Sequence, residues 1–255
     1  MPIEHVMGMP VRVAGEIDAG RVFSWLRWVD ATFSTYRPDS EISRLDRGEL
    51  GDPDPLVREV LDRCERLRAE TGGLFDVRAG GRLDPSGYVK GWAVERAAAF
   101  GRGRFLIDAG GDIVLRGRWR VGIRHPYQPG RLAAAITVAD CAIATSGAYE
   151  RGPHILDPRT GRPAAGLSSV TVLGRDLGTA DAYATAAFAS GDPRWIAGLS
   201  AMCIASDRVF TSRSWPRSQI RKRVRVTTAT KSRSGTRQAR PSSRRRSAQA
   251  PAARS

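Results

Sequence analysis

The sequence His154-Ile155-Leu156-Asp157-Pro158-Arg159-Thr160-Gly161-Arg162-Pro163 gathers an imidazole, a carboxylate and a guanidinium around one turn. Pro158 restricts Asp157 to an extended conformation, and Gly161-Arg162-Pro163 supplies further turn residues. Eighteen residues later, Asp181-Ala182-Tyr183-Ala184-Thr185 places an acid and a hydroxyl one helical turn apart. A turn that carries His and Asp, beside a helix that offers two oxygen ligands, indicates a site for a charged, metal-bound substrate.

Outward from this stretch, the predicted secondary structure mixes helices and strands. Residues 18–33 and 54–71 carry apolar side chains at spacings of three and four, which is typical of amphipathic helices, and residues 91–100 and 177–190 are also predicted to be helical. Strands are predicted at residues 11–13, 104–108, 113–116, 119–124, 133–138, 169–174 and, as a pair, within 202–211. Strands in runs, with helices between the runs, indicate an α+β fold.

The distribution of charged residues along the chain changes near residue 216. The net charge is +15, but residues 217–255 hold 13 of the 41 Lys and Arg residues and no Asp or Glu, so the rest of the chain is close to neutral. Beyond Val226 the sequence is almost wholly Arg, Ser, Thr, Ala and Pro, which cannot bury enough apolar surface to fold. We expect a folded domain at 1–216 and a disordered basic tail at 217–255. The tail is either a segment that contacts RNA, DNA or anionic lipid, or the product of a gene read out of frame.

Cysteine usage and hydropathy indicate the compartment. Cys64, Cys141 and Cys203 are odd in number and widely spaced, which fits buried small hydrophobic residues better than disulfides or a zinc site. No stretch reaches the roughly 18 apolar residues of a membrane span. The N-terminus lacks the pattern of a signal peptide. We therefore expect a soluble, cytoplasmic protein without a membrane span.

Three motifs are candidates for ligand contact, each with a structural alternative. Residues 83–95 are predicted to be a loop that leads into a helix, where backbone N–H groups and Lys90 offer a seat for phosphate; a β-turn with a solvated Lys90 is the alternative. Asp108-Ala109-Gly110-Gly111-Asp112 fits a turn that a ligand approaches closely, or a hairpin turn. Thr145-Ser146-Gly147 lacks the flanks of a nucleophile elbow and fits a loop that bonds to its own backbone.

The metal-ligand and base candidates also have two interpretations. Asp181 and Thr185 share a helix face and offer the hard oxygens that Mg²⁺ or Ca²⁺ prefers. The alternating Ala residues around them predict close packing, where a lone acid is costly unless it is paired or metal-bound; exposed helix polarity is the alternative. His154, close to Asp157 in sequence, fits either a general base poised near neutral pH or a histidine that holds the loop through hydrogen bonds.

The motifs, taken in order, resemble those of the FAD:protein FMN transferases, the ApbE family. The resemblance includes Asp84-Pro85-Ser86-Gly87-Tyr88-Val89-Lys90-Gly91-Trp92-Ala93-Val94 and Ala180-Asp181-Ala182-Tyr183-Ala184-Thr185-Ala186. The other matching segments lie at residues 7–10, 33–45, 71–76, 108–113, 144–147 and 154–163. Eight segments in family order make coincidence a poor explanation.

The resemblance implies an ApbE-type, T-fold-like mixed α/β architecture over the first 216 residues. It implies an enzyme that splits FAD at its pyrophosphate, attaches FMN through a phosphoester to a Thr or Ser hydroxyl of an acceptor protein, and releases AMP. Mg²⁺ is the expected metal, with Ca²⁺ or Mn²⁺ as alternatives, because a divalent cation neutralises the pyrophosphate oxygens.

The resemblance also implies roles for individual residues. Asp181 and Thr185 hold the metal with a backbone carbonyl near Gly87, and His154 takes the proton of the acceptor hydroxyl. Contacts with FAD are expected from Met7, Tyr36, Leu74, Phe75, Asp76, Asp84, Lys90 and Ile155. Two other functions stay open on the sequence: a Mg²⁺-dependent FAD pyrophosphatase that yields FMN and AMP, and a non-enzymatic protein that binds nucleic acid through its basic tail.

Overall fold

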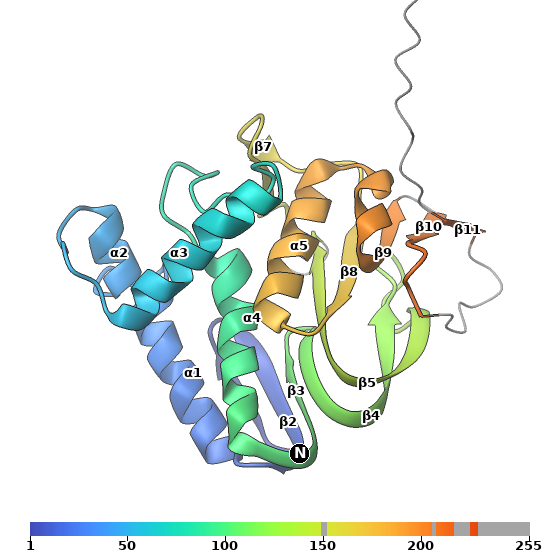
Figure 1. The fold of residues 1–255 in the computed structure, drawn as a ribbon, viewed down its shortest axis with the longest axis horizontal. Helices are drawn as coiled ribbons and strands as arrows, with labels where there is room; N and C mark the ends of the chain where they lie inside the picture. Colours follow the sequence, from blue (N-terminus) through green and yellow to red (C-terminus); the bar gives the residue numbers. More distant parts are fainter. Residues whose placement is uncertain (149–151, 206–207, 217–224, 229–255) are drawn as a thin grey trace, which may run out of the picture.

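The computed structural model describes residues 1–148, 152–205, 208–216 and 225–228. A curved sheet forms one layer of the molecule, and helices cover one of its faces (Figure 1). The elements in chain order are β1 (Ile3–Val6), β2 (Met9–Ile17), α1 (Ala19–Phe33), α2 (Glu41–Asp46), α3 (Pro55–Glu70), α4 (Ser86–Ala97), η1 (Ala98–Phe100), β3 (Gly101–Ala109), β4 (Asp112–Arg124), β5 (Leu132–Gly147), β6 (Leu156–Asp157), β7 (Arg162–Pro163), β8 (Ser169–Gly174), α5 (Leu177–Ser190), η2 (Pro193–Gly198), β9 (Ser200–Ala205), β10 (Arg208–Thr211) and β11 (Arg225–Thr228).

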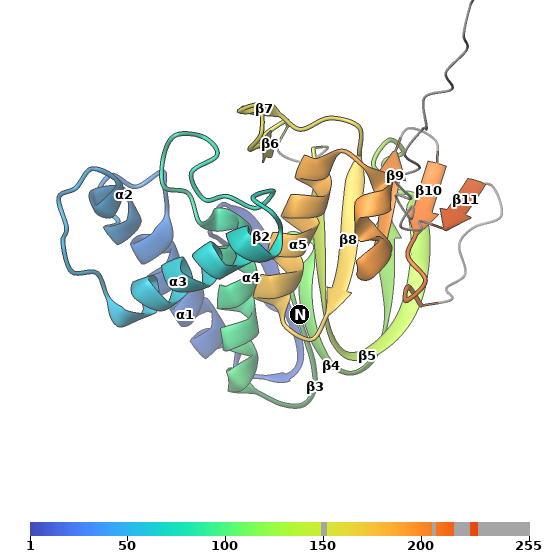
Figure 2. The same ribbon diagram turned by 45° about the horizontal axis from the view of Figure 1, so that its top comes forward.

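The main sheet has the order β1-β2-β3-β4-β5-β8-β9-β10-β11. Its neighbouring strands are antiparallel except β10 and β11, which pair in parallel. The short strands β6 and β7 form a separate hairpin, which lies near the end of α5 (Figure 2). This mixture of an antiparallel sheet and covering helices confirms the predicted α+β class.

Strands β4 and β5 are longer and more curved than the sequence indicated. The predicted strands 113–116 and 119–124 are one strand, and 133–138 is the first part of another. A register shift between Leu115 and Arg118 interrupts their pairing, where Gly117 and Asp140 both have positive φ. Bulges of this kind bend a strand and break its alternation, so the pattern appeared to end where the strand continues.

The sheet buries apolar side chains on both faces. The larger core lies between the sheet and α1, α3, α4 and α5, and includes Val22, Leu67 and Ile107, all fully buried. A second cluster contains Leu115, Ile136 and Met202 and forms where β4, β5, β9 and β10 curve together. Where both faces are buried, successive side chains are apolar, as at residues 142–144 of β5, whereas the second half of β4 alternates buried residues with the exposed Arg118, Arg120 and Arg124.

Three of the four predicted helices have the expected bounds. Asp18 caps α1 by accepting the N–H of Arg21 at 3.0 Å, and Asp54 caps α3 by accepting the N–H of Leu56 at 2.7 Å. Helix α5 spans the predicted residues 177–190. The caps confirm that carboxylates at these positions satisfy backbone donors at the start of each helix.

The prediction for residues 83–95 was wrong in one respect. Helix α4 begins at Ser86, five residues before the expected start at Gly91, so Lys90 lies within the helix and not in the loop before it. Gly87 and Gly91 have low helix propensity and concealed this start. Asp84, in the loop, accepts the N–H of Ser86 at 3.0 Å.

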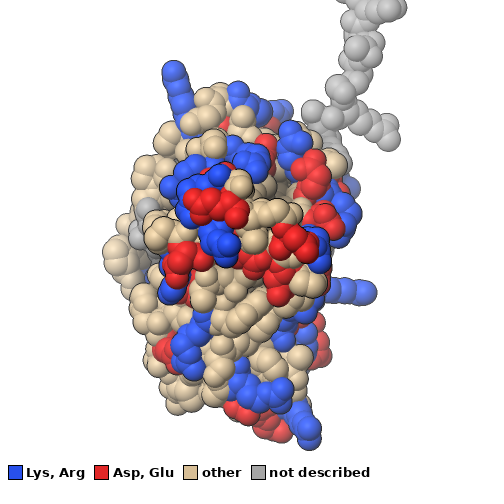
Figure 3. Space-filling view, turned by 90° about the vertical axis from the view of Figure 1, so that its left-hand side faces the viewer, with Lys and Arg blue, Asp and Glu red and all other residues tan. Residues whose placement is uncertain are grey.

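Acidic and basic side chains alternate over the face that carries α2 and α3 (Figure 3). The ion pairs Arg47–Glu49 and Arg63–Glu70, each 2.6 Å long, belong to these helices and the segments that follow them. This interleaving agrees with the near-neutral charge of residues 1–216. Within the predicted tail, Arg225–Thr228 forms the strand β11, and residues 217–224 and 229–255 lie outside the described residues, so the disorder of the tail stays a prediction.

All three cysteines are free thiols; the predicted burial is confirmed for Cys64 and Cys203, whereas Cys141 is half-buried. In the part of the chain that the structure describes, no helix is long and apolar enough to cross a membrane.

Candidate functional site

Helices α4 and α5 lie side by side and approach each other through glycine (Figure 1). A Cβ added at Gly91 would lie 2.5 Å from the carbonyl oxygen of Leu177, and one at Gly178 would lie 2.7 Å from the Tyr88 ring. Because both obstacles lie closer than real Cβ contacts occur, only glycine permits this approach. The contact brings Lys90 of α4 beside Asp181 of α5.

A buried cluster of three charges occupies this junction. The Lys90 ammonium forms one ion pair with Oδ2 of Asp112, at the start of β4, and a second with Oδ1 of Asp181 at 3.6 Å. Asp112 is 0% exposed and Asp181 1% exposed, whereas the Lys90 side chain is 22% exposed. Two carboxylates and one ammonium give the cluster a formal charge of −1.

The buried position of Asp181 disfavours the charged form of its carboxyl group. Burial raises the pKa of Asp181 well above its ordinary range; the charge of Lys90 opposes the shift and the charge of Asp112 adds to it. Oδ2 of Asp181 has no hydrogen-bond partner among the described residues. A buried carboxylate oxygen without a donor is costly, so this atom is suited to a cation.

Thr185, Ser146 and Gly87 lie together beside the charged cluster. Oγ1 of Thr185 is 3.4 Å from Oγ of Ser146, which is buried at the end of β5. A Cβ at Gly87 would lie 3.4 Å from Oγ1 of Thr185 and 3.2 Å from the Phe75 ring. The structure thus brings two of the three predicted metal-holding residues, Gly87 and Thr185, into proximity, and Asp181 lies one turn before Thr185 on α5.

Asp112 and Ser146 belong to this site, although the sequence motifs that contain them gave neither residue a role of its own. Oδ1 of Asp112 accepts the N–H of Thr145 at 2.9 Å, which ties β4 to β5 next to Ser146. The sequence offered a signal in Asp108-Ala109-Gly110-Gly111-Asp112, where Gly110 and Gly111 have positive φ and form a hairpin turn between β3 and β4. That turn directs Asp112 into the core, which the pattern alone did not reveal.

The predicted base, His154, is exposed. Its Nδ1 donates to the carbonyl oxygen of Gly152 at 2.9 Å. A carbonyl only accepts hydrogen bonds, so Nδ1 carries a proton, and the lone pair of a neutral ring is on Nε2. The nearby Asp157 pairs with Arg159 through two contacts of 2.8 Å, and this pairing lowers the pKa of the Asp157 carboxyl.

The predicted FAD contacts lie in several environments. Phe75 is buried in the core, and Lys90 belongs to the charged cluster. Asp76 pairs with Arg68 at 3.1 Å. Tyr36 is 96% exposed, so its ring is available to a planar ligand. Met7, Leu74 and Ile155 are partly buried against the core, and Asp84 is exposed.

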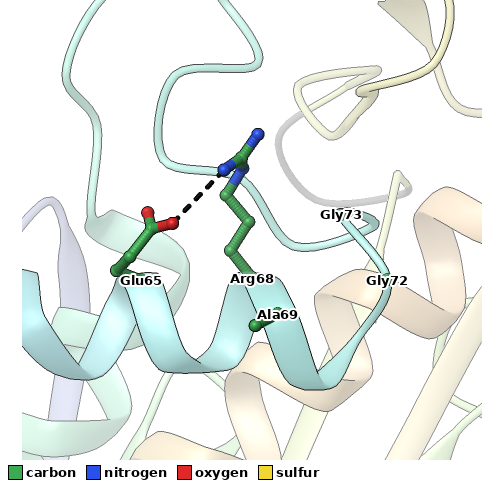
Figure 4. A pocket seen from close by; sticks show the side chains of 5 residues that line it. All are labelled: Glu65, Arg68, Ala69, Gly72 and Gly73. Carbon is green, nitrogen blue, oxygen red and sulfur yellow. Dashed lines mark hydrogen bonds and ion pairs between the residues drawn. The ribbon is translucent and has the colours of Figure 1, made fainter.

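A cavity of about 310 Å³ opens at the end of α3 (Figure 4). Glu65, Arg68 and the Gly72-Gly73 turn contribute to its lining. Arg68 pairs with Glu65 at 3.3 Å, as Figure 4 shows, and with Asp76 at 3.1 Å. The cavity therefore adjoins the segment 74–76, from which FAD contacts are expected.

The residues at the junction fit a hard divalent cation. Within the described ranges, no group of three or more His, Cys, Asp or Glu side chains is arranged to hold a metal. A buried oxygen of Asp181 without a partner, and the hydroxyl of Thr185, are the donors that Mg²⁺ uses when water and substrate phosphate complete its shell. The site therefore suits a metal that is shared with an anionic substrate.

Comparison with known protein families decides the identity of the fold. The family model described as the ApbE family matches residues 7–81 and 77–204, which include every residue of the junction. The chain belongs to the ApbE family. The resemblance seen in the sequence is thereby confirmed.

Curated relatives of this ApbE chain carry the name FAD:protein FMN transferase. The protein from Rhodobacter capsulatus is 37% identical over 193 residues, which cover 69% of this chain and 35% of the relative. The protein from Treponema pallidum is 35% identical over 184 residues, covering 58% and 51% respectively. The one from Salmonella typhimurium is 31% identical, covering 71% and 73%. The chain thus spans about half the length, or less, of the first two relatives.

Solved ApbE structures share the architecture. The ApbE protein from Thermotoga maritima superimposes with a TM-score of 0.75 at 22% identity, over 84% of this chain and 97% of that one. The flavin transferase ApbE from Vibrio cholerae has a TM-score of 0.69 at 24% identity, over 84% and 99%. The predicted ApbE-type mixed α/β architecture is confirmed by these likenesses.

Proposed function

We propose that the protein is an FAD:protein FMN transferase that moves FMN from FAD to a Thr or Ser hydroxyl of an acceptor protein. Membership of the ApbE family and the names of its curated relatives support this activity. The single observation that carries the chemistry is the partnerless buried oxygen of Asp181 beside Thr185. Such a site favours a divalent cation and, with it, a diphosphate substrate.

Mg²⁺ is the metal we propose, held by Asp181, Thr185 and a backbone carbonyl near Gly87. When bound, it supplies charge neutralisation for the pyrophosphate oxygens. The chain's own residues supply the framework: α5 carries the carboxylate and the hydroxyl on one face, and the contact through Gly91 fixes α4 against it. Lys90 adds a positive charge to the same junction.

We propose His154 as the base. The hydrogen bond from Nδ1 to Gly152 leaves Nε2 to take the proton of the acceptor hydroxyl. As that proton leaves, the hydroxyl oxygen forms a bond to the FMN phosphorus, and the bond from this phosphorus to the bridging oxygen breaks. AMP departs with the electron pair of the broken bond. The exposure of His154 suits this role, because the acceptor is itself a protein.

Flavin transfer to a defined acceptor tests the proposal. The purified chain is incubated with FAD, Mg²⁺ and an acceptor protein that contains a single flavinylation Thr, and the acceptor is examined for flavin fluorescence after denaturing electrophoresis. A fluorescent acceptor band is expected. An acceptor whose Thr is changed to Val should stay dark, because Val keeps the shape and lacks the hydroxyl.

Variants of the enzyme assign the roles. Asp181→Ala combined with Thr185→Ala is expected to abolish transfer, and His154→Gln to slow it by about 10²–10⁴-fold. No acceptor labelling by the wild type at any Mg²⁺ concentration would reject the transferase. Release of FMN and AMP without acceptor would instead favour the FAD pyrophosphatase. The nucleic-acid alternative depended on the tail, whose side chains lie outside the described residues, and the family and its relatives give it no support.

A further inference from the structure

Asp112 has a place in the site that the proposed chemistry does not use. It is fully buried at the start of β4, directly after the Gly110-Gly111 turn. Its two oxygens have different partners: Oδ1 accepts the N–H of Thr145 at 2.9 Å, and Oδ2 forms the ion pair with Lys90. One end of the carboxylate is thus fixed to the sheet, and the other end faces the ammonium on α4.

The two contacts of Lys90 are unequal. Its ammonium lies against Oδ2 of Asp112, whereas Oδ1 of Asp181 is 3.6 Å away. Oδ2 of each carboxylate is buried without a hydrogen-bond partner among the described residues, but the Oδ2 of Asp112 has its ion pair with Lys90. An ammonium placed between two buried carboxylates moves toward the nearer charge, since attraction grows as distance falls. Asp112 therefore draws Lys90 away from Asp181.

The charge of the cluster also depends on Asp112. With all three groups ionised, the formal charge is −1, and a divalent cation raises it to +1, which suits a diphosphate. Without the charge of Asp112, Lys90 and Asp181 would neutralise each other. A cation would then compete with an internal ion pair for the same carboxylate.

We propose that Asp112 is a positioning residue of the metal site, which holds the Lys90 ammonium to one side so that Asp181 keeps an oxygen for the divalent cation. This inference rests on the proposed function, in which Asp181 is a metal ligand. It assigns Asp112 no contact with the metal or the flavin. Its effect reaches the metal through Lys90.

Asp112→Asn isolates the charge from the fold. Asn has nearly the same shape, and its carbonyl oxygen accepts the N–H of Thr145 as Asp112 does. A purely structural Asp112 would therefore tolerate this change. If Asp112 acts through Lys90, the variant loses the attraction that holds the ammonium, and Lys90 moves onto Asp181.

Binding of Mn²⁺ to the full chain without FAD, measured by calorimetry or electron paramagnetic resonance, tests the inference. We expect Asp112→Asn to bind Mn²⁺ about 10- to 100-fold more weakly than the wild type, the usual loss for a residue that orients a metal ligand. Asp108→Asn is the matched control: Asp108 lies in the same turn and accepts the N–H of Gly111, but pairs with Arg12 instead of Lys90. Its affinity should stay within about twofold of the wild type.

A second substitution makes the test specific for Lys90. Asp112→Asn combined with Lys90→Met has the wild-type formal charge of −1 and no ammonium to cover Asp181, so it should recover most of the lost affinity. Lys90→Met alone should bind Mn²⁺ no more weakly than the wild type. This single variant tests the inference even if Asp112→Asn fails to fold. Thermal unfolding of each variant reports its folding.

The outcomes are distinct. Wild-type affinity in a folded Asp112→Asn, a double variant as weak as Asp112→Asn, or weaker binding by Lys90→Met would each overturn the inference and leave the proposed transferase standing. If the wild type does not bind Mn²⁺, the proposed metal site itself is wrong, and the inference is overturned with it.

Discussion

The contact between α4 and α5 leaves no space for a side chain at residue 91. In Gly91→Ala the new Cβ would lie 2.5 Å from the Leu177 carbonyl oxygen, and ordinary contact begins at 3.4 Å, so the helices must separate by about 0.9 Å. Overpacking costs about 1–3 kcal/mol, and a backbone obstacle places this case at the upper end. Alanine regains about 1 kcal/mol through its helix propensity. The net loss is about 2 kcal/mol, which lowers Tm by about 4–8 °C for a domain of this size.

Thermal and urea unfolding measure this loss, with Gly20→Ala as the matched control. Gly20 is an exposed glycine of α1, where a Cβ would make an ordinary contact of 3.4 Å with Asp18. The control should be stabilised by about 0.5 kcal/mol. Because Lys90 and Asp181 lie on the two helices that separate, Gly91→Ala should also weaken Mn²⁺ binding. A Gly91→Ala protein that unfolds at or above the wild-type temperature would refute the close approach.

Three further predictions concern single residues. Because the pKa of Asp181 is raised in the folded protein, the metal-free protein should lose stability as pH rises from about 4 toward that raised pKa. Asp181→Asn should not show this loss. Urea unfolding across this pH range measures the free energy of unfolding of both proteins. Burial raises the pKa of Cys64 and Cys203 to about 12, so both thiols should resist Ellman's reagent at pH 8 until the chain unfolds, and fast reaction in the native state would contradict their burial. Glu95 accepts the N–H of Leu177 at 2.9 Å and pairs with Arg116 at 2.9 Å, so Glu95→Ala should cost at least about 1 kcal/mol in thermal unfolding, and an unchanged Tm would show that neither contact stabilises the fold.

Local signals in the sequence were enough to predict the helices that begin with a capping side chain. Asp18 and Asp54 satisfy backbone donors within three residues, so the pattern and the structure depend on the same contacts. Helix α4 began earlier than expected because its stability comes from packing: Gly91 weakens the helix but permits the contact with Leu177. At residue 91, packing against α5 outweighs the low helix propensity of glycine.

The candidate site was predictable in its parts but not in its connections. The spacing of Asp181 and Thr185 on one helix face is legible in the sequence, since it follows from the helical repeat. The ion pairs of Lys90 join residues 22 and 91 positions apart, and no local pattern encodes them. Asp112 was missed as a site residue for this reason, because its significance depends on which way the turn before it directs the side chain.

The long hairpin of β4 and β5 places the candidate site and the connection between its two strands at opposite ends. Asp112 begins β4 and Ser146 lies near the end of β5, so the open end of the hairpin carries the site, while residues 125–131 join the strands at the other end. The 13 residues of β4 give a path of about 40 Å between the two ends. An affinity tag or a fluorophore inserted at that connection would report on the protein, or anchor it to a support, while leaving the open end and its candidate site accessible.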